Sequence, residues 1–178
     1  MWFDAVVVPS EAELADALTT ATRAAVTDLF RDNPSHTFYY VTLTTPGEAF
    51  GPALSAWSHE ALAQRADAAE IRYSYADSPF SIVCEEHLKP VRDLFAGRPE
   101  VFDIADDDAS EAEFELRLRV METALRRLAD EGLFGVGEAR ANVLVLAEVV
   151  PDDEENVARA RRLNPPGAAL DAWLTYWA

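Results

Sequence analysis

The sequence predicts a single α+β domain spanning residues 1–178, with a mixed or mostly antiparallel sheet of about four to five strands and packed helices. Nearly half of the residues (49%) are hydrophobic, so the chain can bury a core without disulfides or a metal. Two long segments show helical apolar spacing, and short runs rich in β-branched and aromatic residues lie between them. No repeat, linker or low-complexity segment divides the chain.

A short strand is expected at residues 3–8, followed by a helix from residue 11. Ser10 and Glu13 form a capping box, because the hydroxyl and the carboxylate each accept a backbone N–H of the other's turn. Apolar residues then repeat at helical spacing, and Asn33-Pro34 ends the helix.

The next segment is predicted to form a strand, a turn and a returning strand. Residues 38–44 are aromatic and β-branched, and 45–48 fit a type II turn with Gly47 at the position of positive φ. The return strand through 49–57 is interrupted by Gly51-Pro52, which predicts an edge strand or a bulge.

The middle of the chain gives weaker patterns. Residues 58–69 predict a modest helix, 71–75 a short strand, and 81–96 a helix that Pro90 kinks or splits.

The longest helix is predicted to start at a second capping box. Ser110 and Glu113 have the required spacing, an apolar stripe runs from Phe114 to Leu128, and Gly132 stands where a helix-ending glycine belongs.

Residues 142–150 give the strongest strand. The run is apolar on both faces, which predicts a central position in the sheet. A short charged helix to Arg162 follows, and then a terminal helix with its apolar stripe from Leu170 to Trp177.

Charge is the feature from which function is argued. Thirty-two Asp and Glu oppose fifteen Lys and Arg, for a formal net charge of −17. Such a field repels nucleic acid and anionic membranes and steers a basic protein toward the surface. A host with an acidic proteome would give the same excess, so both explanations stay open. The predicted partner-binding residues are two acidic clusters: Asp106, Asp107, Asp108, Glu111, Asp152, Asp153, Glu154 and Glu155.

A second hypothesis is a small-molecule binder or enzyme. Its pocket would lie near Trp57, Tyr73, Tyr75 and Asp77, although aromatic residues of this kind more often pack in a core. Asp77, in front of Ser-Pro, is also expected to accept backbone hydrogen bonds in a turn. No catalytic residues are identified.

No metal or cofactor is predicted. Cys84 and His87 stand three residues apart, but His36 and His59 lack the spacing of further zinc ligands. The glycines of Gly135-Val136-Gly137 follow a helix and precede a strand, the reverse of a dinucleotide-binding loop.

A third hypothesis is a structural homo-oligomer, with a homodimer joined through Trp173 and Trp177. The single cysteine, an N-terminus without signal-peptide character and the lack of a 20-residue apolar stretch predict a cytoplasmic protein.

Four segments carry a resemblance to a bacterial family of uncharacterised domains, the domain-of-unknown-function family 4303. They are 38–40 (Phe-Tyr-Tyr), 73–80, 124–135 and Leu163-Asn164-Pro165, and the likeness covers roughly residues 10–175. The resemblance implies no catalytic residues. Because members look like small proteins found beside toxin genes, it implies an immunity or accessory role by association.

Overall fold

A computed structural model describes residues 8–151 and 155–177. The strand expected at 3–8 lies outside this part of the chain, apart from its last residue. A four-stranded mixed sheet runs in the order β3-β2-β1-β4, with β1 parallel to β4 and antiparallel to β2. The predicted α+β fold is confirmed. The strands are β1 (Phe38–Pro46), β2 (Ala53–Ser58), β3 (Phe80–Val83) and β4 (Leu144–Val150).

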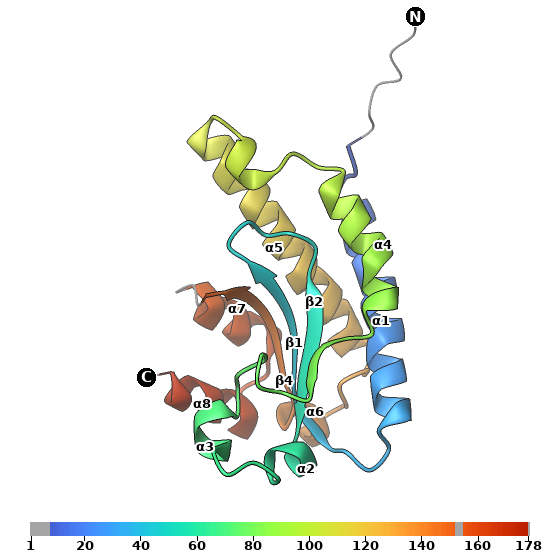
Figure 1. The fold of residues 1–178 in the computed structure, drawn as a ribbon, viewed down its shortest axis with the longest axis vertical. Helices are drawn as coiled ribbons and strands as arrows, with labels where there is room; N and C mark the ends of the chain where they lie inside the picture. The colour runs from blue at the N-terminus through green and yellow to red at the C-terminus, as the bar shows by residue number, and fades with distance from the viewer. Residues whose placement is uncertain (1–7, 152–154, 178) are drawn as a thin grey trace, which may run out of the picture.

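Helices cover both faces of the sheet (Figure 1). Helices α1 (Glu11–Asp32), α4 (Glu85–Ala96) and α5 (Asp107–Asp130) pack on one face and enclose the larger core cluster. Helices α7 (Glu155–Leu163) and α8 (Ala168–Tyr176) contribute to the smaller cluster on the other face. The short helices are α2 (His59–Leu62), α3 (Ala68–Ile71), α6 (Glu138–Ala141) and the 3₁₀ turn η1 (Val101–Asp103).

The capping box predicted for α1 is confirmed. The Glu13 amide donates to the Ser10 hydroxyl oxygen at 3.2 Å, and the Ser10 amide donates to the Glu13 carboxylate at 2.8 Å. These contacts also lower the pKa of Glu13.

The capping box predicted for α5 is wrong. Asp106 caps this helix by accepting the Ala109 amide at 2.9 Å, so the helix starts four residues earlier than expected. Ser110 instead donates to the carbonyl of Val101. At the other end, Gly132 has φ of +81° and Leu133 donates to the carbonyl of Leu128, as a glycine-ended helix requires.

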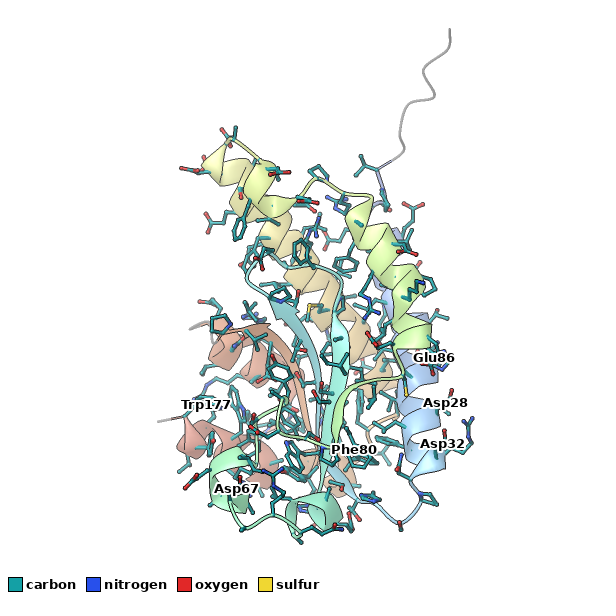
Figure 2. All side chains as sticks on the ribbon, in the orientation of Figure 1. Asp28, Asp32, Asp67, Phe80, Glu86 and Trp177 are labelled. Carbon is teal, nitrogen blue, oxygen red and sulfur yellow. The ribbon has the colours of Figure 1, made fainter. Side chains whose placement is uncertain are left out.

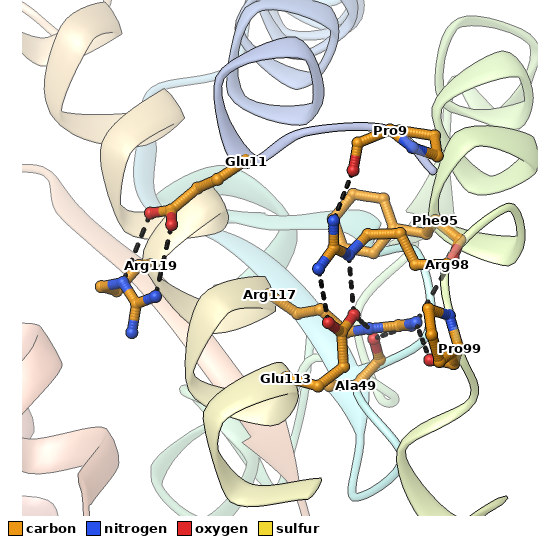
Figure 3. Close-up of polar contacts among 9 residues, drawn as sticks. All are labelled: Pro9, Glu11, Ala49, Phe95, Arg98, Pro99, Glu113, Arg117 and Arg119. Carbon is orange, nitrogen blue, oxygen red and sulfur yellow. Dashed lines mark hydrogen bonds and ion pairs between the residues drawn. The ribbon is translucent and has the colours of Figure 1, made fainter. Parts of the chain in front are cut away.

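Glu113 does not cap α5, because its carboxylate binds two arginines (Figure 3). The Glu113 carboxylate accepts hydrogen bonds from the guanidinium groups of Arg98 at 2.5 Å and Arg117 at 2.8 Å. Arg117 also donates to the carbonyls of Ala49 and Pro99. Burial alone would raise the pKa of Glu113, but the two guanidinium hydrogen bonds outweigh burial and lower it. This cluster joins α5 to the end of α4 and to the β1–β2 turn.

The predicted turn at 45–48 is displaced by one residue. The Ala49 amide donates to the Pro46 carbonyl at 2.8 Å, and Ala49, not Gly47, takes the positive φ. The β2 strand is interior, so the predicted edge position is wrong, whereas the predicted alternative, a bulge, agrees with the irregular register of its pairing with β3 between Leu54 and Ala56. Gly51 is required for another reason: a Cβ there would stand 2.6 Å from the Cα of Arg92 on α4.

Between β2 and α4 the predicted elements differ from the structure. The expected helix at 58–69 divides into α2 and α3, and the expected strand at 71–75 is a turn after α3. The expected helix at 81–96 starts only at Glu85, because its first residues pair with β2 as β3. Pro90 lies within the continuous α4.

The apolar strand β4 is at the end of the sheet, not at its centre. Helix α5 covers one face of this strand, and the α7 and α8 side of the molecule covers the other. The apolar run therefore indicates that helices cover both faces of β4, and it does not indicate how many strands pair with it.

Two asparagine side chains, one in α7 and one just after it, cover the outer edge of β4. Asn164 accepts the Val145 amide at 2.8 Å and donates to the Val145 carbonyl at 2.7 Å; Asn156 does the same at Val149, both at 3.0 Å. These two amides replace the hydrogen bonds of a neighbouring strand at Val145 and Val149.

Candidate functional site

A cavity of about 600 Å³ lies where the carboxyl ends of β1 and β4 approach the end of α8. Four aromatic side chains line it: Tyr73 and Tyr75 come from the segment after α3, and Tyr176 and Trp177 from the end of α8. Glu148, from β4, also lines the cavity. A carboxylate thus faces a space surrounded by rings.

Glu148 is held by two hydroxyl groups of the neighbouring strand. Along β4, even-numbered residues face the smaller core cluster, as do Tyr40 and Thr42 across the parallel β1 pair. Tyr40 donates to Glu148 Oε2 at 2.7 Å and Thr42 donates to the same oxygen at 2.6 Å. Glu148 is only 5% exposed, and these contacts fix its carboxylate at the cavity wall.

The Tyr40 hydroxyl acts as a hydrogen-bond donor to Glu148. Burial, together with the adjacent Glu148 carboxylate, raises the pKa of this phenol well above its ordinary value. The hydroxyl therefore keeps its proton at neutral pH and continues to donate to Glu148.

The aromatic wall is built from contacts between distant segments. The rings of Tyr73 and Tyr176 stand edge to face with centroids 5.2 Å apart, and those of Tyr176 and Trp177 do the same at 5.2 Å. Trp177 is 46% exposed and lies at the outer side of the molecule, near the C-terminus (Figure 2). The wall is buried at Tyr73 and open to solvent at Trp177.

The end of α8 adds a negative potential to this cavity. Helix carbonyls at a C-terminus carry a partial negative charge, and α8 ends beside Tyr176 and Trp177. The helix end and Glu148 both favour a positively charged occupant.

The residues of the predicted pocket do not line one common cavity. Trp57 is fully buried and donates to the Ser74 carbonyl at 2.7 Å, which positions Tyr73 and Tyr75 in the Glu148 cavity. Asp77 lines a different cavity of about 570 Å³, on the side of Arg65 and His36.

Asp77 makes a different turn contact from the expected one. Its carboxylate accepts the Ser74 hydroxyl at 2.6 Å, while the Phe80 amide donates to the hydroxyl oxygen of Ser78. Ser78 therefore takes the backbone-bonding role that was predicted for Asp77.

Glu148 was missed by sequence reasoning, together with the place of Tyr176 and Trp177 in a cavity. The available signal was a single carboxylate inside an otherwise apolar strand, flanked by Ala147 and Val149. An acid at such a position must find donors or solvent, because burying an isolated charge is costly.

The first acidic cluster lies at the exposed tip of α5. Asp106 caps the helix, and Asp107 and Asp108 stand in its first turn, where carboxylates complement the helix dipole. In the second cluster, Asp152, Asp153 and Glu154 lie outside the described residues, and Glu155 begins α7. A face shared by the two clusters stays a prediction.

His87, three residues after Cys84, contacts a carboxylate of α1. His87 Nε2 lies 2.7 Å from Asp28 Oδ2, a contact that lowers the pKa of Asp28. Burial and the nearby carboxylates, among them Glu86, Asp28 and Asp32 (Figure 2), raise the pKa of Cys84. In residues 8–151 and 155–177, no three His, Cys, Asp or Glu side chains gather in a metal-binding group.

The two terminal tryptophans differ in burial. Trp173 is 2% exposed and packs in the smaller core cluster, whereas Trp177 is nearly half exposed. A homodimer through both residues stays a prediction, with Trp177 as the accessible member.

A family model described as a domain of unknown function (DUF4303) matches residues 18–165. The chain belongs to this family. No curated protein and no solved structure matches the chain. Within the described residues, no helix combines the length and the apolar character needed to cross a bilayer.

Three of the four segments by which the sequence resembles DUF4303 contribute to the features described above. Tyr40 holds Glu148, Tyr73 forms the cavity wall, and Asn164 closes the edge of β4 beside them.

Proposed function

We propose that this DUF4303 protein is a binding module for positively charged ligands, with the Glu148 cavity as the receptor for a cationic group. The observation that carries the proposal is a buried carboxylate, 5% exposed, that lines an aromatic cavity of about 600 Å³. An ammonium group beside aromatic faces gains about 0.5–2 kcal/mol from cation–π attraction, most when water is excluded. Glu148 adds an opposite charge.

The acidic surface favours a basic protein as the natural carrier of that group. The formal charge of −17 speeds the approach of a cationic partner, and the lysine or arginine side chain of such a partner fits the cavity chemistry. In this form the protein is a cytoplasmic inhibitor of the immunity type, which binds a basic toxin.

The test asks whether binding depends on the charge of the ligand or only on its shape. Isothermal titration calorimetry at low salt compares choline with 3,3-dimethylbutan-1-ol, an uncharged molecule of nearly the same shape. We expect choline to bind at least about tenfold more tightly and Glu148→Gln to abolish this preference. Glu138→Gln, an exposed site on α6 with the same change of charge, is the matched control and should retain the preference.

Two results would overturn the proposal. One is equal binding of choline and the uncharged alcohol. The other is an equal loss of choline affinity in Glu148→Gln and Glu138→Gln, which would assign the effect to net charge alone.

A further inference from the structure

A second cavity, of about 400 Å³, lies at the opposite end of α8 and has the opposite electrostatic character. Its polar lining comes from Arg72, His59, Asn142 and Thr37, and its aromatic surface from Tyr39 and Tyr73. We propose that it is a binding site for the carboxylate of a small organic acid. This inference concerns a different cavity and does not depend on the function proposed for Glu148.

Arg72 carries the inference. Its side chain is half-buried, and its guanidinium lies 5.1 Å from the centroid of the Tyr73 ring. The Nε atom is buried and has no hydrogen-bond partner, and the ion pairs within the described residues leave Arg72 out. Elsewhere in this acidic chain, arginines such as Arg23 and Arg98 hold carboxylates in two-pronged contacts.

The Arg72 guanidinium thus has neither an ion-pair nor a hydrogen-bond partner for its charge among the described residues, and an oxyanion bound at its terminal nitrogens would supply one. The planar guanidinium matches a carboxylate through two parallel hydrogen bonds. Among the described residues that line this cavity there is no Asp or Glu, despite the net charge of the chain.

The start of α8 supports the same conclusion. Its N-cap is Gly167, which has no side chain to accept the first amides, and Ala168 and Ala169 line the cavity. The amino end of a helix carries a partial positive charge that favours anions.

The remaining lining selects among anions. Arg72 brings one permanent positive charge, which matches the single charge of a carboxylate better than the double charge of a phosphate. The ring of Tyr39 stacks on His59 with centroids 4.7 Å apart, and Leu144 adds an apolar wall. An aromatic or aliphatic body attached to the carboxylate would contact these surfaces.

Benzoate and benzamide serve as probes, because they share a shape and differ in charge. Saturation-transfer NMR and calorimetry at low salt should show benzoate binding at least about tenfold more tightly than benzamide. Arg72→Gln should abolish the difference and Arg72→Lys should retain part of it. Arg161→Gln, an exposed position on α7, is the control with the same loss of charge and should behave as the wild type.

Substitution of the Arg72 side chain spares a neighbouring contact, because Tyr39 donates to the Arg72 backbone carbonyl. Thermal unfolding of each variant verifies that it is folded. The proposal is overturned if benzamide binds as well as benzoate, if Arg72→Gln and Arg161→Gln lose benzoate equally, or if inorganic phosphate binds more tightly than benzoate. Glu148→Gln should keep benzoate binding, which separates this site from the first.

Discussion

Two buried glutamates of this protein have different surroundings. Glu113 is 8% exposed and lies between the guanidinium groups of Arg98 and Arg117, inside the contact of α4, α5 and the β1–β2 turn (Figure 3). Glu148 is 5% exposed, is held by the hydroxyls of Tyr40 and Thr42, and lines an aromatic cavity.

The comparison shows that burial alone does not indicate the role of a carboxylate. At Glu113 the cluster links three segments, because Arg98 follows α4 and Arg117, on α5 itself, also donates to the Ala49 carbonyl between β1 and β2, so this charge serves the fold. At Glu148 the carboxylate is held at the wall of a space large enough for a ligand, which suits binding. Substitution should separate the two roles.

The largest effect is expected at Glu113. Glu113→Gln leaves Arg98 and Arg117 without a buried counter-charge, and breaking such a cluster costs about 3–5 kcal/mol of unfolding free energy. Urea denaturation measures the loss. Glu11→Gln, which breaks the exposed pair with Arg119 in the same region, should cost less than about 1 kcal/mol. Equal losses would show that the Glu113 cluster contributes no more than a surface pair.

A smaller effect is expected at the edge of β4, where neutral groups are buried. Asn164→Leu removes the partner of both backbone groups of Val145, and we expect a loss of roughly 2–4 kcal/mol from two unsatisfied groups. Denaturation and amide hydrogen exchange at Val145 both report it. Unchanged exchange at Val145 would show that water replaces the asparagine without cost.

The smallest change in stability is expected at Glu148. Glu148→Gln keeps an oxygen that accepts the hydroxyls of Tyr40 and Thr42, and it removes a buried charge. The unfolding free energy should therefore fall by less than in Glu113→Gln or Asn164→Leu, while choline binding is lost. A loss as large as that of Glu113→Gln would contradict the comparison and make Glu148 part of the structural framework.

Local signals in the sequence were sufficient for several elements. Ser10 and Glu13 cap α1 as predicted, and Gly132 ends α5. These features depend on residues within one or two helical turns, whose hydrogen bonds form without knowledge of the rest of the chain. The same local reasoning failed at Ser110, because Arg98, from outside α5, binds Glu113 together with Arg117 of the same helix.

By itself, the sequence determined the α+β class, the two long helices, the strongest strands, the acidic charge and the resemblance to DUF4303. Periodicity and capping are short-range properties, and composition is independent of the fold. Tertiary structure alone decided the edge position of β4, the pairing of β3 and the meeting of Glu148 with Tyr40, 108 residues away. Strand order and cavity walls depend on contacts between distant segments, for which side-chain patterns along one strand carry no information.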